Sequence, residues 1–158
     1  MPDLEKAVEH LAFETYHFRS YGKMRKSSSW SSFHPSFRQA VITALLVHLR
    51  VLLDFFYKAS TRDDCHVDCF CQSRPFAERF APAPSPEATE VFDELSKRLV
   101  HLTEVRWLKN APLMRYYEDY SGGIEALIVR FEDALPPDLR QIYDQAQEHW
   151  LSAHPPAF

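Results

Sequence analysis

The chain has 158 residues and a formal net charge of −4 at pH 7, and it is 46% hydrophobic and 25% charged. This length is enough for one domain with its own core, and the apolar content excludes disorder for most of the chain. Its three glycines fall well below the usual share of about 7%, which argues against a glycine-rich nucleotide fold or a turn-rich barrel. We therefore expect a single all-α domain over residues 1–158.

The first predicted helix covers residues 3–23. Its apolar side chains recur at alternating spacings of four and three, the pattern of an amphipathic helix that lies on a core. We place Glu5, Glu9 and Glu14 on its polar face. A polar, serine-rich connection over residues 24–35 follows.

The second predicted helix covers residues 36–58, with Ser36 as its N-cap. It is apolar on most of its circumference, which is typical of the central helix of a bundle. Polar residues such as Arg50 and Asp54 interrupt the apolar run, so we do not expect it to span a membrane. The centre of its apolar stripe consists of Val41, Leu45, Leu52 and Phe55.

Three more helices are predicted. Two of them, over residues 85–109 and 136–150, carry a proline at or next to their first residue (Pro86 and Pro136), and proline is favoured in the first turn of a helix. A helix over 112–134 contains Gly122–Gly123, where we expect a kink that divides it into two pieces. The tail at 151–158 should be loose. The whole predicts an up-down bundle of four to five helices.

Several polar residues fall where apolar ones are expected. His48 lies in the apolar stripe of the second helix, with Arg50 and Asp54 on the opposite face, and Arg106 takes an apolar position on the 85–109 helix. One hypothesis is that these groups line a binding cleft, with an imidazole for proton transfer and arginines for a phosphate. The alternative is structural: His48 is a satisfied core histidine, and an acid such as Asp54 holds Arg106.

Two stretches carry a family resemblance. Residues 49–57 and 97–106 are similar to segments of uncharacterised bacterial all-α proteins, in which an Arg-x-x-x-Asp-Phe-Phe helix precedes an "Ala-His-Leu-Thr-x-x-Arg" helix. The order of elements over residues 3–135 also resembles the HEPN superfamily of helical bundles. Many members of that superfamily are dimeric, metal-independent ribonucleases or toxin components. The resemblance implies a HEPN-like bundle.

The HEPN resemblance also implies catalytic residues. The superfamily motif is an arginine followed after a short spacer by a histidine, and Arg98 and His101 are the matching pair here. Arg98 precedes His101 by only three residues, and the better-spaced pair of His101 and Arg106 has the reverse order. In the implied mechanism His101 takes the 2′-hydroxyl proton while Arg98 and Arg106 stabilise the phosphate. An inactive, scaffold-like member remains the alternative.

A cysteine cluster lies within the long inter-helix loop predicted at residues 59–84. Cys65, His66, Cys69 and Cys71 supply three thiols and one imidazole, the atoms that bind zinc tetrahedrally. Their spacing differs from that of a finger or ribbon, which takes its ligands from two separate knuckles. Zinc binding is therefore one hypothesis, and a partly buried loop without metal is the alternative.

A small basic and aromatic patch lies at the C-terminal end of the first predicted helix and in the connection that follows it. It is either a solvated helix end or a contact surface for nucleic acid. Its members are Arg19, Lys23, Arg25, Lys26, Tyr16, Tyr21 and Trp30.

Function follows from these observations as three hypotheses. We first expect a cytoplasmic, bacterial, HEPN-like homodimer that binds RNA and cleaves it without a metal. The second is a non-catalytic interaction or scaffold module, and the third is a zinc-binding protein. The odd number of cysteines, all in one cluster, favours the reducing cytoplasm over an oxidising compartment.

Overall fold

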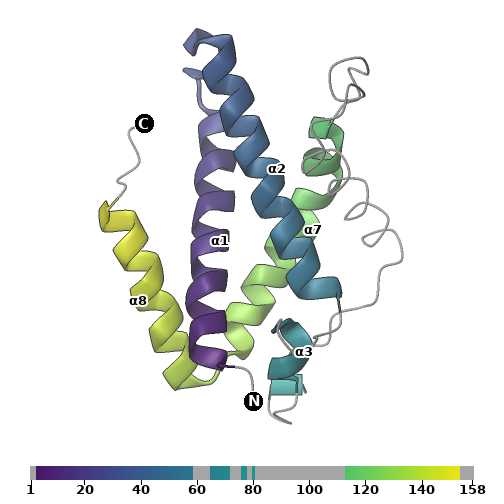
Figure 1. The fold of residues 1–158 in the computed structure, drawn as a ribbon, viewed down its shortest axis with the longest axis vertical. Coiled ribbons are helices and arrows are strands. Elements are labelled where there is room, and N and C mark those ends of the chain that lie inside the picture. Colours follow the sequence, from purple (N-terminus) through teal and green to yellow (C-terminus); the bar gives the residue numbers. More distant parts are fainter. Residues whose placement is uncertain (1–2, 59–64, 72–75, 78–79, 81–112, 154–158) are drawn as a thin grey trace.

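The computed structural model of the chain describes residues 3–58, 65–71, 76–77, 80 and 113–153 (Figure 1). Every regular element within these ranges is helical, so the all-α prediction is confirmed there. The predicted 85–109 helix lies outside the described residues.

The first helix is longer than predicted. Helix α1 spans Leu4–Lys26, and the backbone N–H of Lys6 donates to the Asp3 carboxylate at 3.2 Å, so Asp3 is the N-cap. Part of the predicted 24–35 connection is therefore helical, and a 3₁₀ turn, η1 (Trp30–Ser32), follows. The predicted polar face is wrong at Glu14, which is buried.

The second helix begins earlier than predicted. Helix α2 spans Pro35–Tyr57, and His34 is its N-cap, because its Nδ1 accepts from the backbone N–H of Ser36 at 3.2 Å. The prediction of Ser36 as the cap is wrong. Proline suits the first helical position because it has no N–H to leave unpaired there. The predicted apolar stripe is buried: Val41, Leu45, Leu52 and Phe55.

Helix α2 is also long and apolar enough to cross a membrane by length and composition, with a mean hydropathy of 1.8. The core helix of a water-soluble bundle passes the same test. In this structure α2 packs against both α1 and α7, and 44% of its most apolar window is buried within the protein. The prediction that the chain does not span a membrane stays a prediction.

The last two long helices are α7 and α8. Helix α7 spans Leu113–Ala134 and runs through Gly122–Gly123 without interruption, so the predicted division into two pieces is wrong. Glycine weakens a helix by only about 1 kcal/mol, which packing against α2 offsets. Helix α8 spans Pro137–Ala153, slightly beyond the predicted end. A short helix, α3 (Val67–Phe70), lies within the cysteine segment.

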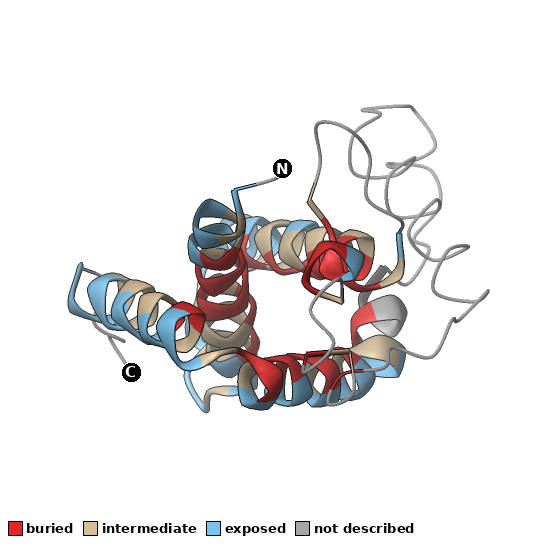
Figure 2. Ribbon diagram, turned by 90° about the horizontal axis from the view of Figure 1, so that it is seen from below, coloured by how far each residue is buried: buried red, intermediate tan, exposed pale blue. Residues whose placement is uncertain are grey.

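Helix α1 lies between α8 and α2, and α7 lies alongside α2 (Figure 1). Helices α1 and α8 run in one direction, and α2 and α7 run in the opposite direction. Their buried faces turn inward, as Figure 2 shows. At the end of the bundle near α3, the fully buried Phe131 ring lies 5.1 to 6.2 Å from five other phenylalanine rings. These are Phe55, Phe56, Phe70, Phe76 and Phe80.

Candidate functional site

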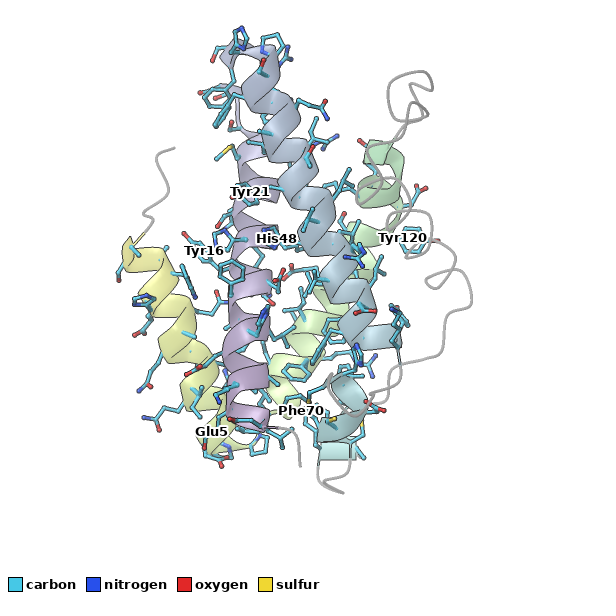
Figure 3. The ribbon with its side chains drawn as sticks, in the orientation of Figure 1. Glu5, Tyr16, Tyr21, His48, Phe70 and Tyr120 are labelled. Carbon is cyan, nitrogen blue, oxygen red and sulfur yellow. The ribbon has the colours of Figure 1, made fainter. Side chains whose placement is uncertain are left out.

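His48 has a carboxylate partner on the neighbouring helix. Its Nδ1 lies 2.6 Å from Oε2 of Glu14, and the two side chains are 12% and 8% exposed. The imidazole stacks on His17, with ring centroids 5.2 Å apart. It also stacks on Tyr21, with centroids 5.7 Å apart, and Figure 3 labels both His48 and Tyr21. His48 thus joins α2 to α1, and this geometry is that of a satisfied core histidine.

Arg50 and Asp54 lie in other surroundings. Asp54 is 2.6 Å from Lys58 Nζ and 3.5 Å from His66 Nε2, at the end of α2 that faces the cysteine segment. Arg50 is half-buried. The structure therefore does not bring His48 and Asp54 together, since the first faces α1 and the second faces α3. The predicted catalytic residues Arg98, His101 and Arg106 lie outside the described residues.

The cysteine cluster is packed against the core. Cys69 is buried, and Cys65 and Cys71 are half-buried. Burial, together with a hydrogen bond to Cys69, raises the pKa of the Cys65 thiol to about 12, and burial also raises that of Cys71. Within the described part of the chain, no group of three or more His, Cys, Asp or Glu side chains is placed to hold a metal ion.

Arg19, a member of the predicted basic patch, is neutralised by α7. Its guanidinium donates to Glu125 at 2.9 and 2.5 Å and to Glu132 at 2.8 Å. Burial acts to lower the Arg19 pKa, but the hydrogen bonds to the two carboxylates more than offset it and raise the pKa. The Tyr143 hydroxyl of α8 also donates to Glu132, at 2.8 Å. This network ties three helices together.

Arg25 is neutralised in the same way. Its guanidinium lies 2.6 Å from the Glu118 carboxylate of α7, and it stands over the Tyr117 ring at 5.6 Å from the centroid. Two of the four cations in the predicted patch are therefore engaged in holding α1 against α7.

Three other cations, at the end of α1 and the start of α2, have no carboxylate partner of this kind. Among the described residues, the side chains of Lys23, Lys26 and Arg38 make no ion pair or hydrogen bond, and the buried Nε of Arg38 lacks an acceptor. Lys23 and Lys26 are exposed on the last turns of α1, and Arg38 is half-buried on the first turn of α2. Their positive charge is available to a ligand.

Aromatic rings lie between these cations in the chain. The Trp30 and Phe33 centroids are 6.3 Å apart, and those of Phe33 and Phe37 are 5.1 Å apart. Phe37 is 45% exposed, the other two rings are half-buried, and none of the three belongs to the hydrophobic core. We call residues 23–38, which hold these rings and cations, the hairpin tip.

The hairpin tip lies within a stretch without acidic residues. Between Glu14 and Asp54 the sequence has six Lys or Arg residues and no Asp or Glu. This bias toward positive charge in the sequence therefore indicates a basic surface. Only the structure separates the cations that α7 neutralises from those it leaves open, because the neutralising acids lie about a hundred positions away.

Comparison with known protein families, curated proteins and solved structures finds no match to this chain.

Proposed function

We propose that this protein binds single-stranded RNA through the hairpin tip. The observation that carries the proposal is the combination of three cations without described acidic partners and three aromatic rings outside the core, of which Phe37 is exposed. The cations are Lys23, Lys26 and Arg38. Proteins that bind single strands combine cations that follow the phosphates with aromatic rings on which bases stack. The chain is acidic overall, but residues 23–38 hold no Asp or Glu, so the cations of the tip would attract RNA at that end.

RNA cleavage is the catalytic extension of this proposal. It rests on the HEPN resemblance and on Arg98, His101 and Arg106, with His101 as the base toward the 2′-hydroxyl. In that arrangement the hairpin tip would hold the strand, and the histidine would act on it without a metal. Incubation of RNA with wild-type protein and with His101→Ala in chelator tests the extension. Equal RNA integrity in both lanes would remove it and leave binding.

RNA binding itself is tested by fluorescence anisotropy with a labelled single strand of about 12 nucleotides, within the size range of known single-strand sites. The Phe37→Ala variant removes an exposed ring and should weaken binding by about fivefold or more, because stacking on one base contributes about 1–3 kcal/mol. Lys26→Gln should weaken binding and flatten its dependence on salt by about 0.7 in the logarithmic slope, the effect of one phosphate contact.

The matched control is Val47→Ala, which shortens another exposed apolar side chain of α2 away from the hairpin tip. It should bind as wild type does. A second probe is an anionic phospholipid vesicle, because exposed aromatic and basic residues also suit a membrane surface. Binding to vesicles and not to RNA would overturn the proposal.

A second candidate function is a scaffold that assembles with another copy of itself. One observation favours it: a groove of about 760 Å³ between α1 and α8, lined by Phe13, Ile142 and Trp150, with Leu151 51% exposed beside it. Sedimentation should then show a dimer for the wild type and a monomer for Ala146→Arg, which would fill the groove. Equal masses for the two proteins would exclude this interface.

A further inference from the structure

We infer that the groove between α1 and α7 holds the sugar-phosphate backbone of the strand whose bases stack on the hairpin tip. This inference rests on the proposed function and specifies its ligand as a single strand that extends beyond the tip. The groove measures about 630 Å³. Lys23 and Lys26 line it from α1, and Ser121 and Gly122 line it from α7.

The charge of the groove suits phosphate. Glu125 also lines it, but Arg19 donates three hydrogen bonds to the Glu125 carboxylate, at 2.9, 3.2 and 2.5 Å. The Arg19 charge is shared between Glu125 and Glu132. The ammonium groups of Lys23 and Lys26 then leave the groove positive. Phosphates contribute most of the affinity of nucleic-acid complexes through contacts with such cations.

Two glycines border the groove. A Cβ on Gly22 would stand 2.6 Å from the Tyr117 hydroxyl oxygen, so the tip of the Tyr117 side chain lies directly against α1 at Gly22. A Cβ on Gly122 would meet no atom within 4 Å, so the α7 wall of the groove is open there. A backbone without a side chain leaves room for a ligand to lie against the helix.

The groove continues into the hairpin tip along the chain. Lys26 lines the groove and is the last residue of α1, and Trp30 of the tip follows four residues later. A strand that leaves the rings therefore meets the groove cations next. A duplex keeps its bases stacked inside and cannot offer them to the rings, so the arrangement selects single strands.

The test uses the two adjacent glycines of α7 as a matched pair. Both Gly122→Glu and Gly123→Glu place the same charge on the same helix, in positions where a Cβ meets no atom within 4 Å. Only Gly122 lines the groove. Both variants should fold, because glutamate is the better helix former. Anisotropy with the single strand should show about tenfold weaker binding for Gly122→Glu and less than about twofold for Gly123→Glu.

The outcomes separate the two proposals. If the wild type fails to bind RNA, the proposed function falls and this inference falls with it. If the wild type binds and Phe37→Ala weakens binding, but the two glycine variants bind equally, only the groove assignment is overturned. Wild-type binding to a duplex of the same sequence with equal affinity would overturn the selection of single strands.

A second variant covers the case in which Gly122→Glu does not fold. Lys23→Gln removes one exposed groove cation, and Lys6→Gln removes an exposed cation from the opposite end of α1. Lys23→Gln should flatten the salt dependence of binding by about 0.7 in logarithmic slope, and Lys6→Gln should leave it unchanged. Equal slopes for the two variants would overturn the groove assignment.

Discussion

The two ends of the α1–α2 hairpin use the same residue types in opposite ways. At the end near α3, the Phe131 ring is fully buried among five other phenylalanines. At the hairpin tip, Trp30, Phe33 and Phe37 contact one another, but none of them joins the core, and Phe37 is 45% exposed. Burial of apolar surface explains the first cluster and does not explain the second.

The cations differ in the same way. Arg19, in α1, is held by Glu125 and Glu132, whereas Lys23 and Lys26 in the hairpin tip form no ion pair with a described acid. Paired charges in a partly buried site hold helices together. The exposed Phe37 ring and cations without an ion pair contribute little to folding, and they are the basis of the RNA-binding proposal.

The largest expected effect is on stability at the end near α3. Phe131→Ala should lower the free energy of unfolding by about 3–5 kcal/mol, because it leaves a cavity among five rings. Phe37→Ala, the same truncation at the hairpin tip, should change it by less than about 0.5 kcal/mol. Urea denaturation followed by circular dichroism measures both. Similar losses of unfolding free energy for the two variants would show that the rings at the two ends contribute equally to stability, contrary to this prediction.

The next effect concerns the cations. Arg19→Met should cost about 2 kcal/mol, because it removes the donors that satisfy Glu125 and Glu132. Lys23→Met should cost almost nothing, since Lys23 is exposed and has no described partner. Thermal denaturation of the two variants makes the comparison. An Arg19→Met protein as stable as the wild type would show that the network does not hold α1 against α7.

A smaller effect is expected at the contact between α1 and α2. Glu14→Ala should cost about 1–3 kcal/mol, because it leaves the His48 ring nitrogen without its partner in a nearly buried position. A double-mutant cycle with His48→Phe separates this interaction from the loss of packing. Additive effects of the two substitutions would mean that the 2.6 Å contact contributes nothing to stability.

The smallest effect concerns chemistry at the cysteine segment. Burial raises the pKa of the Cys65 thiol to about 12 from an ordinary value near 9.0. At pH 8 the folded protein therefore holds less thiolate than the unfolded chain, and alkylation of Cys65 should be faster after denaturation. The raised pKa also means that this group favours folding below pH 9.0 and loses that contribution as the pH rises toward 12. Mass spectrometry of alkylated native and denatured protein measures the two alkylation rates of Cys65. Equal rates would contradict a raised pKa in the folded protein.

Much of the fold could be predicted from local pattern. The spacing of apolar residues on α1 and α2 predicted which faces are buried, because the helical period alone sets which side chains share a face. The ends of the helices were harder to predict from the sequence than their buried faces. His34 caps α2 through its ring nitrogen, although histidine is not among the residues usually favoured at that position.

In the candidate site too, some features could be predicted from the sequence and others depend on the tertiary structure. The sequence by itself predicted an all-helical fold, which the described residues show, together with the buried stripes and a stretch of six cations without an acid between Glu14 and Asp54. Only the tertiary structure decided that Glu14 pairs with His48 and that α7 neutralises Arg19 and Arg25 but leaves Lys23 and Lys26 open. The physical reason is distance along the chain: periodicity orients a side chain on its own helix, whereas packing of the whole bundle chooses the helix that it faces.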